Sequence, residues 1–354
     1  MKSQFSRAGG ALAALAVGAG LALAPTAAQA ATTPQAGSAA SWLADQLPAG
    51  TILQTSGFPD YGLTIDFALA LVDTGTEAAA VDRIVEALAT TPETFSQYTT
   101  TVGFDDRADS QVAGATAKLA TLVQMTGGDP TSFGGEDLIE DVETVTVDEG
   151  ASAGRASDIS DFGDFSNAIG QSFVVRALTT AGSDEATAAT DYLLAQQCAN
   201  GGFLLALSDD GCGTATNTSI DTTAFVVQAL AEAGDAGYDG ADAAIADAVD
   251  FLVDTQADDG SFSDVTGPNS NSTGLAAVAL ATGGEGAAAT AAADYVADLQ
   301  VADGPNAGAI AFDQAALDAG TGGELGDQFR RATAQAAPGL AFASEPRSEA
   351  HTSE

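Results

Sequence analysis

The chain has 354 residues, of which 49 are acidic and 10 are basic, so its formal net charge is −39 at pH 7. Nucleic acids and anionic lipids bind proteins through clusters of Lys and Arg, which excludes both as partners of so acidic a chain. Intrinsic disorder is also excluded, because 45% of the residues are hydrophobic and the chain is long enough to bury a large core.

Residues 1–30 have the pattern of a secretory signal peptide. A basic start with Lys2 and Arg7 is followed by an apolar run at 11–24 and by the small-residue sequence Ala28-Gln29-Ala30. We expect cleavage after Ala30, which gives a secreted, extracellular protein with eight basic residues against 49 acidic ones. No later stretch is apolar enough to span a membrane.

A marker recurs along the rest of the chain: Gln, three residues, Gly, and a bulky residue two positions further on. It is complete at 197–203 and 256–262, has Ile in place of Phe at 46–52, and is half present at 300–304. An apolar helix is expected before each marker, at 40–47, 188–197, 243–256 and 291–300. These helices carry Asp and Glu on one side, so they should face water.

A second type of helix follows, opened by a polar capping residue and closed by Gly. These helices are expected at 66–75, 110–127, 167–182, 221–234 and 272–283. They are apolar nearly all round, which indicates that they are buried. A final inner helix is expected at 309–318 and a short closing helix at 328–336.

The caps of the inner helices are about fifty residues apart, and weaker outer helices begin at 81–90 and 136–147. The sequence therefore predicts an all-α fold, an α/α toroid of about six helix pairs with inner and outer helices. It should form one domain over residues 31–343. The polar residues 344–354 should be a disordered tail.

The markers at 197–203 and 256–262, each followed by a capped inner helix, resemble the prenyltransferase and squalene-oxidase repeat of the terpenoid cyclase/prenyltransferase superfamily. The resemblance covers most of residues 39–319 and implies the toroid fold. It does not extend to the chemistry of that superfamily. The zinc site of the prenyltransferases needs His, and the only histidine is His351 in the tail. The Asp-x-Asp-Asp acid of class II cyclases and the Cys-Gly-Glu-Gln of thioester domains are absent from the sequence.

Asp105, Asp106 and Asp109 spell the Asp-Asp-x-x-Asp with which class I terpene synthases hold magnesium against a diphosphate. The alternative is a solvated loop in which Asp109 or Ser110 caps the next helix.

Further acidic loops offer oxygen ligands for calcium, although none has a twelve-residue calcium loop closed by Glu. Asp209 and Asp210 form one of them, and the others are Asp158, Asp161 and Asp164, and Asp258, Asp259 and Asp264. Solvated turns are the alternative, since Asp and Gly favour turns.

Cys198 and Cys212 are the only cysteines. An exported chain with two cysteines favours one disulfide bond over two free thiols. In the chain-entropy description, a loop of this length is worth about 3 kcal/mol.

The function that we expect is that of a secreted, non-catalytic binding or cell-surface protein. Its ligand would be a small apolar molecule or a cell-envelope component, because the inner wall is built from Ala, Val, Leu and Phe. The alternative is an enzyme of terpenoid cyclase-like or carbohydrate-active type that uses rim carboxylates, with or without a divalent metal. A structural envelope protein without a ligand would have a central cavity packed shut.

Overall fold

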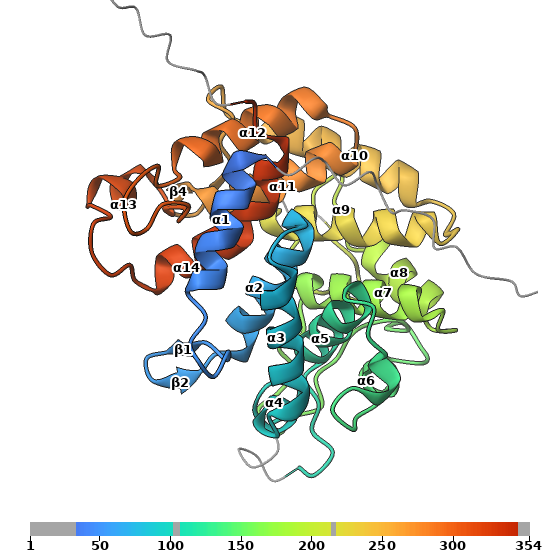
Figure 1. Cartoon of the computed structure of the whole chain (residues 1–354). Coiled ribbons are helices and arrows are strands. Elements are labelled where there is room, and N and C mark those ends of the chain that lie inside the picture. Colours follow the sequence, from blue (N-terminus) through green and yellow to red (C-terminus); the bar gives the residue numbers. More distant parts are fainter. Residues whose placement is uncertain (1–32, 102–106, 214–216, 346–354) are drawn as a thin grey trace, which may run out of the picture.

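The computed structural model describes residues 33–101, 107–213 and 217–345, and Figure 1 shows their arrangement. Within these segments the chain forms fourteen α-helices, two 3₁₀ helices and two short hairpins. The expected signal peptide and most of the expected tail lie outside the described residues.

Six inner helices form a closed ring, which confirms the predicted toroid. Each packs against the next, and the last packs against the first. They are α2 (Tyr61–Thr74), α5 (Ala113–Met125), α7 (Ala168–Ala181), α9 (Ile220–Asp235), α11 (Ser270–Thr282) and α14 (Asp327–Ala336).

Six outer helices surround this ring. They are α1 (Pro34–Asp45), α3 (Ala78–Thr90), α6 (Leu138–Thr144), α8 (Ala186–Leu194), α10 (Ala241–Thr255) and α12 (Gly286–Asp298). In Figure 1 the blue α1 lies beside the red α14, so the two ends of the described chain meet. The 3₁₀ helix η2 (Ala337–Phe342) packs against α1, α11 and α12 and seals this junction.

The remaining elements belong to the connections. They are α4 (Glu93–Gln97), α13 (Gln314–Asp318), the 3₁₀ helix η1 (Pro130–Ser132), the hairpin of β1 (Gln54–Thr55) and β2 (Phe58–Pro59), and the hairpin of β3 (Ser263–Asp264) and β4 (Gly267–Pro268). In the described part of the chain, no helix is long and apolar enough to cross a membrane.

Four of the six inner helices begin with a side-chain cap of their own, often earlier than predicted, whereas α5 and α14 do not, and the predicted Ser110 does not cap α5. Asn167 caps α7 as predicted, and its Oδ1 accepts from the Ile169 and Gly170 amides. The caps of α2, α9 and α11 are instead Asp60, Ser219 and Asn269. The predicted cap Asp66 lies in the second turn of α2, because the apolar pattern of that helix already starts at Tyr61.

The prediction of the last inner helix was wrong. Residues 309–318 contain a buried bridge at Ile310 and the exposed helix α13, whereas α14 occupies the inner ring. Helix α14 has charged residues on its exposed side, so its sequence looks amphipathic like that of an outer helix. Its Phe329 and Thr333 are nevertheless buried, and the Thr333 Oγ1 accepts the Ile310 amide at 2.8 Å.

The marker Gln joins neighbouring units of the ring. The Gln256 Nε2 donates to the Gly260 carbonyl of its own loop at 3.0 Å and to the Ala288 carbonyl of the next outer helix at 3.0 Å. Gln197 makes the equivalent pair of bonds. The Gln300 Nε2 donates to the Gln35 carbonyl at 2.9 Å and so joins the last unit to the first.

The marker Gly is required for two reasons. Gly201 has φ +86°, and a Cβ there would lie 2.0 Å from the Asp247 carbonyl oxygen of α10. The sequence match at 46–52 has no structural counterpart, because Gly50 has neither a positive φ nor a close neighbour.

A buried polar residue at the fourth position of most inner helices anchors the preceding loop. Thr64, Thr223 and Thr273 accept the backbone N–H groups of Leu53, Phe203 and Phe262 at 3.0, 3.0 and 2.9 Å. In α7 this position is Gln171, whose Oε1 accepts the Ala156 amide at 2.7 Å and whose Nε2 donates to the Gly154 and Ala189 carbonyls. This bonding fixes the loops against the ring.

Candidate functional site

The sixth residue of each of the first five inner helices lies toward the centre of the ring. These residues are Asp66, Lys118, Phe173, Phe225 and Leu275. Helices that run parallel around a ring place residues of equal rank at the same level along the ring axis. These five side chains therefore form one layer across the centre. Two members are charged, and the wall is therefore not the purely apolar surface that the sequence led us to expect.

Lys118 and Asp66 form an ion pair in this layer. The Lys118 Nζ also donates to the Gly62 carbonyl at 3.4 Å. Burial alone would lower the pKa of Lys118, but the Asp66 carboxylate raises it above its usual value, so Lys118 remains charged. Burial raises the pKa of the nearby Tyr98 to about 12.

A second ion pair lies further along the ring axis. An Arg176 Nη lies 2.7 Å from the Glu232 Oε1, the Arg176 Nε donates to the same oxygen at 2.9 Å, and the guanidinium stacks over the Phe173 ring at 5.7 Å. The Asp73 residue is exposed to solvent at the mouth of the ring. Desolvation by the surrounding protein nevertheless raises the pKa of its carboxyl to about 6, and the positive charge of Arg176 opposes this rise. Together with the ring pair Phe173–Phe225, 5.7 Å apart, these groups fill the centre.

The space left between the inner helices is about 60 Å³. Its walls are mainly apolar and include Leu69, Leu275, Val278 and Pro338. An engineered cavity of about 150 Å³ binds benzene, and sites for drug-sized ligands measure roughly 300–1,000 Å³. The ring as it stands does not have room for a prenyl chain.

The carboxylates proposed as metal ligands are only partly described. Asp105 and Asp106 lie outside the described residues. Asp109 pairs with Arg107 at 2.9 Å. The Asp209 carboxylate accepts from the Ser152 Oγ at 2.7 Å and the Tyr192 OH at 3.0 Å, while Asp210 is exposed. Among the residues that the structure describes, no three His, Cys, Asp or Glu side chains are grouped as a metal site would need.

The other acidic loops use their carboxylates to hold backbone. The Asp158 Oδ1 accepts the Ala113 amide at 2.8 Å and so caps α5 from another unit. The Asp259 and Asp264 carboxylates each accept the amide two residues further on. This pattern is that of Asx turns, which was the alternative to calcium binding.

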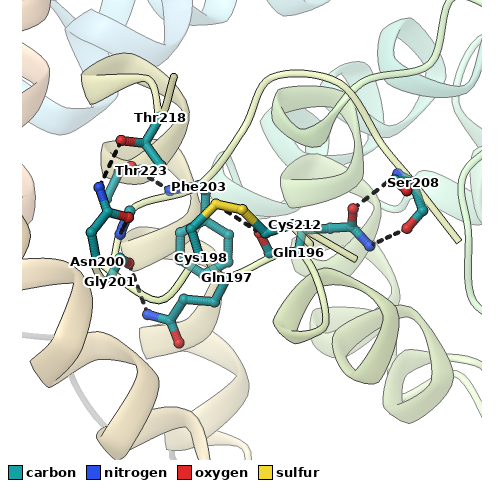
Figure 2. The surroundings of a disulfide bond; sticks show 11 residues. Gln196, Gln197, Cys198, Asn200, Gly201, Phe203, Ser208, Cys212, Thr218 and Thr223 are labelled. Carbon is teal, nitrogen blue, oxygen red and sulfur yellow. Dashed lines mark hydrogen bonds between the residues drawn. A yellow bond between two sulfur atoms is a disulfide. The ribbon is translucent and has the colours of Figure 1, made fainter. Parts of the chain in front are cut away.

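The two cysteines form a disulfide bond, as predicted. Figure 2 shows Cys198 joined to Cys212 in the connection between α8 and α9. Just before the loop that the bond closes, the Gln196 side chain accepts the Ser208 amide at 2.9 Å and donates to the Ser208 carbonyl at 3.0 Å. The loop is thus held at its two ends by the disulfide and at Ser208 by Gln196.

The connections that lead from an outer to an inner helix lie together at one end of the ring, and we call them the loop rim. Among the described residues they comprise 46–60, 98–101, 107–112, 145–167, 195–213, 217–219, 256–269 and 299–326. Neighbouring connections are bonded to one another, for example through the Gln111 amide and the Ile159 carbonyl at 2.9 Å and through the Ala168 amide and the Leu205 carbonyl at 2.9 Å.

The loop rim carries most of the exposed large hydrophobic side chains in the described part of the chain. Five of the six belong to it: Phe58, Phe162, Phe165, Leu205 and Val265. The sixth is Val253 on α10. Sequence reasoning missed this set, although a large apolar residue inside an Asp- and Gly-rich loop is a visible signal for it.

No protein-family model matches the chain, and no curated protein matches its sequence. Several solved structures share its fold. A protein from Actinoplanes matches with a TM-score of 0.61 and 16% identity over 87% of this chain and 98% of its own. The type II terpene cyclase MstE from Scytonema matches with a TM-score of 0.61 and 15% identity, covering 87% and 96% of the two chains.

Another MstE structure, which holds the substrate geranylgeranyl dihydroxybenzoate, matches with a TM-score of 0.63 and 14% identity over 87% and 96% of the two chains. The ent-copalyl diphosphate synthase from Streptomyces platensis matches with a TM-score of 0.53 and 16% identity over 80% of this chain and 50% of its own. The chain thus has the α/α-toroid fold found in the terpenoid cyclases.

Proposed function

We propose that this protein is a secreted, non-catalytic binding protein that uses the cyclase toroid as a scaffold. The observation that carries the proposal is the filled centre of the ring, where only about 60 Å³ is left between two ion pairs and two aromatic rings. A cyclase needs that space for its substrate, whereas a scaffold gains stability from filling it.

The charges inside the ring also count against cyclase chemistry. Protonation of an alkene needs a desolvated carboxylic acid beside aromatic faces that stabilise a cation. Asp66 is paired with Lys118 instead, and the face of Phe173 is already occupied by the Arg176 guanidinium. The sequence has no Asp-x-Asp-Asp that could supply another acid.

The size of the central space bears on the two ligand classes that we expected, and on the third possibility of a structural protein without a ligand. A small apolar ligand would have to displace side chains from the ring, whereas a cell-envelope partner needs only the outer surface. The second class is therefore the better supported. The alternative of an enzyme that uses carboxylates is favoured by one observation, a separate pocket of about 500 Å³ whose lining includes Glu136 and Asp141.

The test uses protein recovered from culture medium. Native mass spectrometry should give a chain that begins at Ala31, carries one disulfide and retains no lipid. Incubation with geranylgeranyl diphosphate, with and without Mg²⁺, should give no cyclised product. A co-purified polyprenyl lipid or any turnover would overturn the proposal.

A cavity variant makes the test of the filled ring sharper. Phe225→Ala enlarges the central space and should gain binding of benzene, as engineered apolar cavities do. The unmodified protein should not bind benzene under the same conditions. Equal binding by both proteins would mean that the ring is open in solution, and the argument from volume would fail.

A further inference from the structure

We infer that the loop rim docks a cationic, amphipathic segment of a partner protein, through an apolar patch formed by Phe162, Phe165 and Leu205. The inference rests on the proposed function, because it names the surface and the kind of partner that a non-catalytic scaffold would use. It commits to a protein segment that carries Lys or Arg together with apolar side chains.

The apolar part of the argument is the exposure of the patch and the contact between its loops. Phe165 is 71% exposed, Phe162 is 57% exposed and Leu205 is 49% exposed. The Ala168 amide donates to the Leu205 carbonyl, and a bridge joins the residue before it, Asn167, to Ala206. Single exposed apolar side chains are ordinary, but a group on adjoining loops marks an interaction surface.

The patch is held in place by polar contacts beneath it. The Phe162 amide donates to the Ser160 Oγ at 3.1 Å, and the Phe165 amide donates to the Asp158 Oδ2 at 3.1 Å. Leu205 lies within the loop that the disulfide closes. Since these loops do not have to become ordered on binding, the entropy lost in docking is small.

The acidic residues around the patch indicate that its partner is basic. Asp161 and Asp164 flank Phe162, and Asp209 and Asp210 follow Leu205 within the same loop. The one basic residue in these two loops, Arg155, pairs with Asp164 at 2.8 Å. An apolar patch with an acidic border complements a basic amphipathic segment and steers its approach.

The same charges argue against two other occupants. A second copy of this chain would bring another acidic surface, since the net charge of each copy is −39. A membrane rich in anionic lipid would be repelled in the same way. A zwitterionic bilayer is not repelled, so it serves as the competing outcome of the experiment.

The experiment measures binding of a synthetic peptide of alternating Leu and Lys blocks, and in parallel of phosphatidylcholine vesicles. The variant is Phe162→Ser, Phe165→Ser and Leu205→Ser combined, and its matched control is Val253→Ser, which changes an exposed apolar side chain on α10. Unchanged circular dichroism and Tm establish that both proteins are folded.

We expect the triple variant to lose about tenfold or more in affinity for the peptide, as when central anchors of an interface are removed. The control should bind like the unmodified protein, and added salt should weaken binding. Equal effects of the two variants, no binding of the peptide, or binding to the vesicles alone would each overturn the inference. The cyclisation assay is independent of these binding results, so a failure of the proposed function can be distinguished from a failure of this inference.

Discussion

Gln171 provides a sharp test of how the loops are fixed to the ring. Replacing it with Met keeps its length and removes its amide. The side chain is fully buried, and three hydrogen bonds are lost at once. The Ala156 N–H would then be left without an acceptor inside the protein.

The expected cost follows from these bonds. A buried amide without a partner costs about 1–3 kcal/mol, and each further hydrogen bond contributes about 1 kcal/mol. We therefore expect Gln171→Met to lower the free energy of unfolding by about 3 kcal/mol. In a domain of about 310 residues such a loss lowers Tm by about 4–5 °C. Differential scanning calorimetry measures both quantities.

Gln46→Met is the matched control. Gln46 matches the sequence marker, unlike Gln171, but within the described residues its side chain is only half-buried and joins no neighbouring unit. Its replacement should change the unfolding free energy by less than about 0.5 kcal/mol. If the two variants were equally stable, the idea that buried amides fasten the units would be refuted.

Three further predictions concern stability. Gly201→Ala should lower Tm more than Gly57→Ala, because both residues have φ near +85° but only at Gly201 would the Cβ meet another helix. Replacing Cys198 and Cys212 by Ser should lower the free energy of unfolding, measured with denaturant, by about 3 kcal/mol if the disulfide alone keeps the loop closed. No change in this free energy would mean that the disulfide is redundant. Burial and neighbouring carboxylates raise the pKa of Asp141 to about 6, so ionisation of Asp141 opposes folding. Asp141→Asn should raise Tm at pH 7.5 but not at pH 4, and a gain at both values would contradict this reasoning.

The order of helices was predictable because the first five inner helices are mostly apolar, and two of them, α2 and α7, end at a Gly with positive φ such as Gly182, with φ +68°. Helix α14 was predicted as a short closing helix at 328–336, but its place in the inner ring was not, because its charged residues face out of the ring beside the loop rim. Arg331 pairs there with Asp327 and Asp60, so the polar side that suggested an outer helix reflects contacts between units that are 271 residues apart.

The contents of the ring centre were not predictable from the sequence. An inner helix that is apolar all round gives no sign of which residue faces the axis, and that direction depends on how neighbouring helices are rotated. Lys118 is the single lysine after the expected signal peptide, yet nothing in its surroundings in the sequence identifies Asp66 as its partner. The disulfide was predictable because only two cysteines exist.

The bond from Gln300 to Gln35 has a consequence for how the molecule assembles. Helix α1 packs against the next helix, α2, but its contacts with η2 form only when the end of the described chain is present, as the hydrogen bond from Thr33 to Leu340 across 307 positions also requires. Such distant pairing slows folding. It also means that the start and the finish of the fold are adjacent, so a circularly permuted chain, cut instead between two later units, should reach the same ring.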